Sequence, residues 1–218
     1  MINEIILASS SPRRKEILTN LGLKFNVVTP NCDEEIDNML PPGEYVETLA
    51  ERKGRNVLEK LKAKGTDLSD KLIVSCDTIV YFDYGQSIIL GKPKDDREAY
   101  LMLSLLSDSW HSVYSGLCLI SGENEEKPYV SSIETRVKFK MISDAQIDAY
   151  IETLEPFGKA GAYGIQLMGG TFVEKIEGDY FNIVGFPVSL FTDMLSVCYH
   201  TDIFEIRKNI EKYEKNKK

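Results

Sequence analysis

"EIILASSSPRRKEILTNLG", residues 4–22, joins an apolar run to three serines, a proline and two adjacent arginines. Residues 4–8 predict a short buried strand. Ser11 is a candidate N-cap, and Pro12 stands at the first helical position, where its missing N–H costs nothing, so we expect a helix up to about Leu21. Such a turn brings free backbone N–H groups and the positive end of the helix dipole to one point. The stretch therefore indicates a phosphate-binding turn in an α/β protein.

Arg13 and Arg14 place two guanidinium groups at the start of that helix. Each guanidinium can donate paired hydrogen bonds to phosphate oxygens, and Ser9 adds a hydroxyl donor to the same turn. A solvated helix start with surface arginines explains the pattern as well. The turn alone leaves both interpretations open.

Composition limits the class of protein. A chain of 218 residues suits one large α/β domain or two closely packed lobes. The formal net charge of −8 argues against broad electrostatic binding to nucleic acid or anionic lipid, so a phosphate site must be a local basic pocket. No apolar run approaches the roughly 20 residues that cross a membrane, and no secretory signal precedes Leu7, so we expect a cytoplasmic protein.

The cysteines and histidines do not indicate a zinc site. The four cysteines form no C-x-x-C pair, and the two histidines are far apart. We therefore expect reduced thiols, which are typical of cytoplasmic proteins.

The rest of the sequence alternates predicted strands and helices. Strands are expected at residues 24–29, 72–82, 87–90, 111–121, 129–141 and 171–176, and helices at residues 44–64, 96–106, 143–154 and 187–200. Residues 205–218 carry six Lys or Arg against three Glu, with little apolar content after Ile210, which favours a solvated helical tail. The prediction is one domain over residues 1–200 and a charged tail over residues 201–218.

Two charged residues fall where apolar ones are expected. Lys53 lies on the apolar stripe of the predicted helix 44–64, and Asp77 interrupts the apolar strand 72–82. An unpaired buried charge is costly, so each needs a partner. Lys53 either points into a polar cleft or extends its stem to water. Asp77 is a magnesium ligand, a general base for water, or a structural carboxylate bonded to backbone N–H groups.

Four further residues are weaker candidates. Glu34, in an acidic stretch, is a second metal ligand or part of a solvated loop. Lys92, between a glycine and a proline, is an aimed cation or a surface lysine. Lys159 and Gln166 flank "KAGAYGIQ", whose small residues let the backbone approach a ligand or simply form a tight turn. Together the candidates indicate a basic, hydroxyl-rich pocket with one or two carboxylates, which suits a phosphate anhydride and a divalent ion.

Six motifs occur in an order that resembles the Maf family of nucleoside triphosphate pyrophosphatases. They are "SSSPRR" (residues 9–14), "LAERK" (49–53), "CDTIV" (76–80), "GKP" (91–93), "EPFGKAGAYGIQ" (155–166) and "GDYFNIVGFP" (178–187). The resemblance runs from about Ile5 to about Leu195.

The resemblance implies both a fold and a reaction. The fold would be that of the inosine triphosphate pyrophosphatases, a twisted mixed sheet flanked by helices, with a central cleft between two lobes. The reaction would cleave a nucleoside triphosphate between its α and β phosphates, releasing a monophosphate and pyrophosphate, with Mg²⁺ or Mn²⁺ as cofactor. The family also suggests a homodimer.

The resemblance implies roles for individual residues. Asp77 matches the proton acceptor for the attacking water, and Glu34 matches an acidic position after the second strand, so both are expected at the metal. Ser9, Arg13, Lys53 and Lys92 match positions placed to bind the triphosphate. With Arg14 and Lys159, taken from the sequence pattern itself, and with Thr78 and Gln166, they are the residues expected to bind substrate. Among these, Arg13, Thr78 and Gln166 match positions tied to base choice. The intact "KAGAYGIQ" is similar to the branch acting on dTTP and UTP rather than the branch preferring 7-methyl-GTP.

Three departures from the family pattern concern base selectivity more than phosphate chemistry. Gly158 stands where an aspartate is common, Phe181 stands where small or polar residues are frequent, and "QLMGG" (residues 166–170) replaces "QGxGG".

Three functions remain as hypotheses. The first is an enzyme that removes dTTP, UTP and modified or other pyrimidine nucleotides from the nucleotide pool. The second is a nucleotide-binding regulator of cell division without significant turnover. The third is a nucleic-acid binder, which is supported only by the basic tail.

Overall fold

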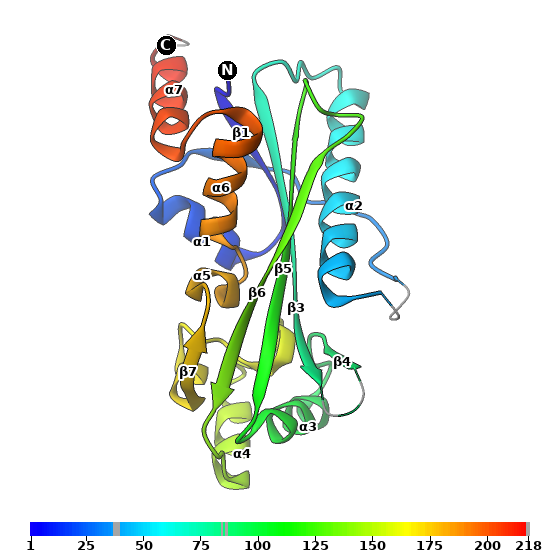
Figure 1. The fold of residues 1–218 in the computed structure, drawn as a ribbon, viewed down its shortest axis with the longest axis vertical. Helices are drawn as coiled ribbons and strands as arrows, with labels where there is room; N and C mark the ends of the chain where they lie inside the picture. The colour runs from blue at the N-terminus through cyan, green and yellow to red at the C-terminus, as the bar shows by residue number, and fades with distance from the viewer. Residues whose placement is uncertain (37–39, 84, 86, 217–218) are drawn as a thin grey trace.

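The computed structural model describes residues 1–36, 40–83, 85 and 87–216. Within these residues a seven-stranded sheet forms the centre of the protein (Figure 1). Its strands are β1 (Glu4–Ala8), β2 (Phe25–Val27), β3 (Lys71–Asp83), β4 (Ser87–Leu90), β5 (Trp110–Ser121), β6 (Tyr129–Phe139) and β7 (Val173–Glu177). The helices are α1 (Pro12–Asn20), α2 (Pro42–Ala63), α3 (Asp96–Leu106), α4 (Asp144–Glu152), α5 (Tyr180–Val184), α6 (Val188–Tyr199) and α7 (Ile203–Asn216). Two short 3₁₀ turns span Ala160–Ala162 and Met168–Phe172.

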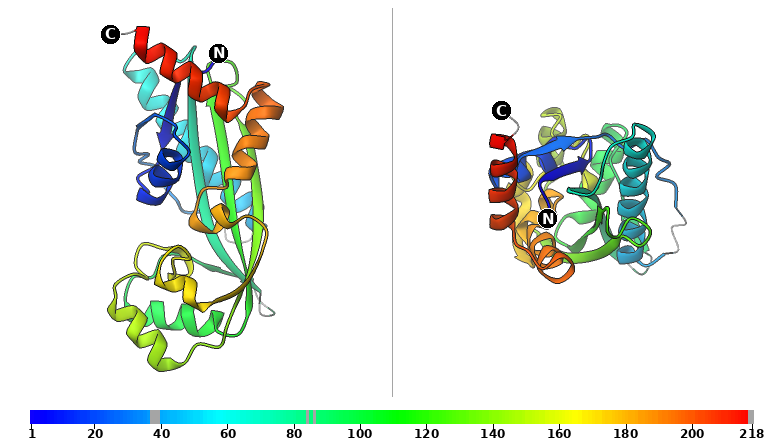
Figure 2. Two further views of the ribbon diagram at one scale, coloured as in Figure 1. Left: turned by 90° about the vertical axis from the view of Figure 1, so that its left-hand side faces the viewer. Right: turned by 90° about the horizontal axis from the view of Figure 1, so that it is seen from above.

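The sheet is mixed. Its strand order is β2-β1-β3-β5-β6-β7, and β4 also pairs with β3. β1 runs parallel to β2 and β3, whereas the other pairs are antiparallel. The long strands β3, β5 and β6 pass through two lobes and connect them (Figure 2). The predicted α/β class with a mixed sheet flanked by helices is therefore confirmed.

Helices cover the sheet differently in the two lobes. In the upper lobe of Figure 1, α2 packs on one face, and α1, α6 and α7 lie on the other. In the lower lobe, α3 and α4 pack on the sheet, and their apolar side chains join those of β3, β5 and β6. Because helices cover both faces of its first half, β3 is buried almost continuously from residue 72 to residue 77.

A gap in strand pairing positions the site. On one edge of β3, β1 pairs with residues 71–75 and β4 pairs with residues 80–83. The opposite edge pairs with β5 over residues 72–81. Among the described residues, no strand pairs with residues 76–79 on the first edge. That part of β3 therefore presents an open edge between the two lobes.

The predicted elements are present, with shifts of a few residues at their ends. A capping box formed by Ser143 and Gln146 opens α4. The sequence did not predict α5 or the two 3₁₀ turns, which are each five residues long or shorter. The sequence between the predicted strands 72–82 and 87–90 also favours a hairpin turn at residues 83–86, which falls partly outside the described residues.

The C-terminal segment differs from the expected solvated tail. It forms α7, whose Ile206 and Ile210 side chains are 1% and 4% exposed and pack in the core of the upper lobe. The error has a physical reason, because two isoleucines four residues apart suffice to bury one face of a charged helix. The domain boundary at residue 200 stays a prediction. Within the described residues, no helix is long and apolar enough to span a bilayer.

Candidate active site

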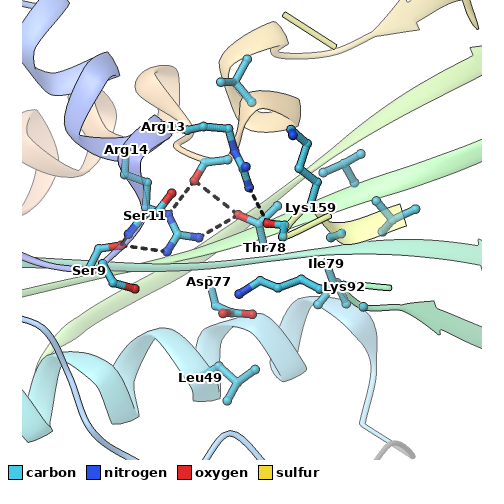
Figure 3. Close-up of a pocket in the computed structure, with 18 of the residues that line it drawn as sticks. Ser9, Ser11, Arg13, Arg14, Leu49, Asp77, Thr78, Ile79, Lys92 and Lys159 are labelled. Atoms are coloured by element: carbon cyan, nitrogen blue, oxygen red, sulfur yellow. Dashed lines mark hydrogen bonds between the residues drawn. The ribbon is translucent and has the colours of Figure 1, made fainter. Parts of the chain in front are cut away.

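A cavity of about 400 Å³ lies at the open edge of β3, between the two lobes. Its walls come from the turn before α1, from α2, from the turn after β4, from the loop after α4, and from the end of α5 (Figure 3). Every predicted site residue lines it: Ser9, Arg13, Arg14, Glu34, Lys53, Asp77, Thr78, Lys92, Lys159 and Gln166. The structure thus brings together residues that are up to 157 positions apart, while their individual roles stay predictions.

Lys53 links the two acidic residues of the cavity. Its Nζ lies 2.6 Å from Asp77 Oδ1 and 3.0 Å from Glu34 Oε1. The Lys53 and Asp77 side chains are about 9% and 10% exposed, whereas Glu34 is 58% exposed. Burial alone would lower the pKa of Lys53, but the charge and hydrogen bond of Asp77 outweigh it and raise that pKa. Lys53 therefore points into a polar cleft, as one of the two interpretations predicted.

Close packing of α2 on β3 aligns this pair. The Ser75 hydroxyl donates a 2.7 Å hydrogen bond to the Ala50 carbonyl oxygen. A Cβ atom at Gly54 would lie 2.7 Å from the Ser75 hydroxyl, so glycine permits the approach. Because Lys53 precedes Gly54 and Asp77 follows Ser75 by two residues, the contact sets the ammonium over the carboxylate.

Arg14 is held by three elements of the fold. Its Nε donates to the Gly185 carbonyl oxygen at 2.8 Å, Nη2 to Thr78 Oγ1 at 3.2 Å, and Nη1 to Ser9 Oγ at 3.3 Å (Figure 3). Thr78 Oγ1 also bonds the Ser115 hydroxyl at 2.8 Å. Arg14 thus carries its positive charge in a fixed orientation, supported by neutral oxygens rather than by a carboxylate.

Arg13 and Lys159 form a second, less compensated group of cations. Arg13 Nη2 donates to the Gly158 carbonyl oxygen at 3.4 Å, and Lys159 Nζ donates to the Glu155 backbone oxygen. Burial, followed by the charge of Arg14, lowers the pKa of Arg13. Burial, followed by the charge of Arg13, lowers the pKa of Lys159. Mutual repulsion of this kind is relieved when a polyanion binds among the cations.

Two further features favour an anion. Lys92 extends toward Asp77 from the opposite wall (Figure 3). At the start of α1, the Ser11 side chain makes no capping hydrogen bond with any described residue. The N–H groups of the first helical turn therefore keep no side-chain cap, as expected for a phosphate-binding turn.

Tyr45 is a cavity residue that the sequence analysis missed. Burial, followed by the charges of Asp77 and Glu34, raises the pKa of its phenol. The sequence contained a signal for this position, because Tyr45, Leu49 and Lys53 are spaced by four residues and therefore share one face of α2. All three line the cavity.

The departures from the family pattern separate in space. Gly158 lies in the cavity wall, with a φ of 74° and open space where a side chain would begin. Phe181 is 42% exposed, and it is not among the described residues that line the cavity.

The carboxylates of Asp77 and Glu34 are chemically suited to Mg²⁺ or Mn²⁺. Asp77 and Glu34 both contact one ammonium group, so their carboxylates lie close together. Among the described residues, no group of three or more His, Cys, Asp or Glu could hold a metal ion. Mg²⁺ commonly takes only one or two protein carboxylates and completes its octahedron with phosphate and water.

A family model described as "Maf-like protein" matches residues 4–198. The chain belongs to the Maf family. Within the family it is similar to a dTTP/UTP pyrophosphatase of Acetivibrio thermocellus, with 44% identity over 88% of this chain and 94% of that protein. A dTTP/UTP pyrophosphatase of Caldicellulosiruptor bescii is 42% identical over 89% of this chain and 94% of that protein. The family match over residues 4–198 contains all six motifs.

Solved structures give more distant matches to this Maf protein. A nucleoside-triphosphatase/dITP/XTP pyrophosphatase of Mycobacterium abscessus is 19% identical, covering 64% of this chain and 75% of its own, with a TM-score of 0.36. The Ham1 protein of Staphylococcus aureus is 14% identical, covering 62% and 71%, with a TM-score of 0.40.

Proposed function

We propose that this Maf protein is a nucleoside triphosphate pyrophosphatase that converts dTTP and UTP to their monophosphates and pyrophosphate. The observation that carries the proposal is one cavity in which a carboxylate, Asp77, is surrounded by cations from both lobes. The names of the relatives support the choice of dTTP and UTP. Modified or other pyrimidine nucleotides are further candidate substrates.

The proposed mechanism needs no covalent intermediate. Water attacks the α phosphorus, and Asp77 accepts its proton. Because Lys53 holds Oδ1 at 2.6 Å, we assign the proton to Oδ2. The ion pair also fixes the direction of the carboxylate, so that the base needs little reorganisation when substrate arrives.

Cations supply the electrostatic part of the proposed catalysis. Triphosphate oxygens repel a nucleophile, and the departing pyrophosphate gains negative charge. Hydrogen bonds orient Arg14 before substrate binds. Arg13 and Lys159 each bond a backbone carbonyl oxygen, so few groups compete with phosphate for them. We assign these residues, with Lys53 and Lys92, to the phosphate oxygens.

Glu34 and Asp77 are the residues that would hold the divalent ion. A bound Mg²⁺ or Mn²⁺ neutralises phosphate charge and polarises the phosphoryl group. Glu34 is 58% exposed, so its carboxylate would be accessible to such an ion from solvent.

The proposed location is the cytoplasm. All four cysteines lie within the described residues and are unpaired, which supports a reducing compartment. A homodimer, implied by the family resemblance alone, is a further expectation that solution scattering can test.

The decisive experiment identifies the product. Purified protein with Mg²⁺ should release pyrophosphate from dTTP and UTP, and a chelator should stop the release. Orthophosphate as the first product would overturn the proposal. Asp77→Asn should lose about 100-fold or more in kcat, as expected for removal of a general base, while nucleotide affinity persists. Nucleotide affinity without turnover in the unaltered chain would instead support the regulator hypothesis.

A further inference from the structure

One acidic residue outside the cavity lining, Glu155, fastens the loop that carries Lys159 and Gln166. Its Oε1 accepts a hydrogen bond from the Gly169 N–H at 3.0 Å, and its Oε2 accepts one from the Met168 N–H at 3.1 Å. Both carboxylate oxygens are therefore used to close residues 155–169 into a ring. Gln166 lies two residues before the first of these anchored N–H groups.

Tyr150, on α4, completes this clamp. Its hydroxyl donates to Glu155 Oε1 at 2.7 Å and accepts a hydrogen bond from the Gly164 N–H at 3.3 Å. The side chain is 3% exposed, and burial, followed by the bond to Glu155, raises the pKa of the phenol, which keeps its proton. The hydroxyl thus joins both Glu155, at the beginning of the loop, and Gly164, within it, to α4.

Two glycines show how tightly the loop is drawn together. A Cβ atom at Gly169 would lie 2.6 Å from the Tyr150 hydroxyl, which no real side chain permits without a shift. A Cβ atom at Gly164 would lie 2.9 Å from Lys159 Cε, so the stem of Lys159 packs directly over that glycine. The route of the lysine therefore depends on where the clamp holds Gly164.

The middle of the loop is anchored independently of the clamp. The Gly161 N–H donates to the Gly91 carbonyl oxygen at 3.1 Å, which ties the loop to the turn that carries Lys92. The Tyr163 hydroxyl lies 2.9 Å from His111 Nε2 in the core of the lower lobe. Because neither contact involves Glu155, we expect them to keep the loop folded when its carboxylate is altered.

We propose that Glu155, acting with Tyr150, is a positioning residue that holds Lys159 and Gln166 in the orientation needed to bind substrate. This inference rests on the proposed function. It assigns to Glu155 no contact with substrate or metal. Its effect reaches the substrate through Lys159, whose ammonium also bonds the Glu155 backbone oxygen, and through Gln166.

The carboxylate is specifically required. A glutamine at position 155 replaces one acceptor oxygen with an NH₂ donor, which would face a backbone N–H or the tyrosine hydroxyl. At least one hydrogen bond of the clamp must then break, and the loop end shifts. Since the shift displaces binding groups rather than the proposed base, the loss should fall on substrate binding.

The test compares Glu155→Gln and Tyr150→Phe with the unaltered chain. A matched control is Ser143→Ala, which removes the capping interaction at the other end of α4, where Ser143 accepts a hydrogen bond from the Gln146 N–H. The control weakens the same helix but leaves every bond of the clamp intact. For each protein, kcat and KM are measured with UTP and dTTP, and Kd is measured by calorimetry with α,β-methylene UTP, which resists cleavage at the α–β bond.

We expect KM and Kd to rise about tenfold in Glu155→Gln while kcat changes less than about threefold. Tyr150→Phe should give a smaller rise in the same direction, and Ser143→Ala should keep the original KM. An unchanged KM and Kd in both clamp variants, or a loss confined to kcat, overturns the inference. An equal rise of KM in Ser143→Ala also overturns it, because loss of helix stability would then explain the effect.

The calorimetric measurement separates this inference from the proposed function. If the unaltered chain binds α,β-methylene UTP but releases no pyrophosphate, the proposed function fails, and the Kd values still decide the role of Glu155. If the unaltered chain does not bind the analogue, both proposals fall.

Discussion

Lys53 Nζ lies 2.6 Å from Asp77 Oδ1, and this buried ion pair joins α2 to the middle of β3. The pair stands where β3 has exchanged one strand partner for another, so its carboxylate faces the cavity rather than a neighbouring strand. One contact therefore serves two purposes. It stabilises the packing of α2, and it holds the proposed base in one direction.

Breaking that pair should destabilise the protein. Lys53→Met leaves the Asp77 carboxylate buried without its cation, and we expect the free energy of unfolding to fall by about 3 kcal/mol at pH 7. Urea denaturation measures the loss. Because the pKa of Lys53 is raised, its contribution is fully present below the unfolded pKa of about 10.5 and is lost as the pH rises through the folded pKa.

A double-mutant cycle provides the control for this prediction. Asp77→Asn removes the uncompensated charge, so the double variant should be destabilised by less than the sum of the single variants. Additive losses would show that Lys53 contributes through its stem packing rather than through the pair.

Stability should also fall in mild acid because of His111. Its imidazole is 3% exposed, contacts Tyr163 and packs edge-on to Phe139. Burial lowers its pKa from 6.5 to about 3, so the unfolded chain binds the extra proton first. The contribution is fully present above pH 6.5 and is lost as the pH falls toward 3.

The expected loss between pH 6.5 and pH 5 is about 2 kcal/mol, at roughly 1.4 kcal/mol per pH unit. Urea denaturation at pH 7 and pH 5 measures it. His111→Gln keeps a hydrogen-bonding group near Tyr163 but cannot take up a proton, so its stability should vary less between these two pH values. The same acid dependence in His111→Gln would assign the effect to other groups.

The docking of α7 gives a further test. Ile206→Ala should lower the free energy of unfolding by about 3 kcal/mol, because the side chain is 1% exposed in the upper core. Phe204→Ala, on the same helix but 72% exposed, should stay within about 0.5 kcal/mol. KM for UTP should be unchanged in both, because neither residue lines the cavity. If Ile206→Ala and Phe204→Ala changed the free energy of unfolding equally, α7 would not pack on the core in solution.

These residues also show what sequence could reveal about this fold. Lys53 and Asp77 were predictable, because a charge inside an apolar pattern demands a partner, and the structure supplies each with the other. The helical spacing of Tyr45 from Lys53 also predicts that Tyr45 faces the site, and the structure places it in the cavity wall. The many lysines and glutamates of α7 favoured a solvated helix in the prediction, although Ile206 and Ile210 alone, among its described side chains, form its buried face.

Other features depend on tertiary contacts that no local pattern encodes. The Glu155 clamp joins side chains and backbone groups up to 14 residues apart through the path of an irregular loop. The open edge of β3 exists only because β1 and β4 pair with different parts of it. The order of the motifs identified the candidate site residues, but only the folded structure shows that they line the same cavity.

The approach of α2 to the sheet gives the last prediction. Gly116, on β5, pairs with Asp77, and a Cβ atom there would lie 2.3 Å from the Val46 carbonyl oxygen. Backbone atoms cannot yield as a flexible side chain can, so Gly116→Ala must push the first turns of α2 away from the sheet. Lys53 and Tyr45 lie on that helix and would move with it.

We therefore expect Gly116→Ala to lose about 2 kcal/mol or more of stability and to lower kcat/KM for UTP about tenfold. Gly122→Ala is the matched control just past the end of β5, where a Cβ atom would meet Leu68 O at 3.1 Å, a contact that a small shift relieves. It should alter stability less and leave kcat/KM unchanged. If Gly116→Ala folds and keeps its original kcat/KM, the close approach of α2 to β5 is not needed to align Lys53 with Asp77. The helix would then have moved away from the sheet without any effect on the site.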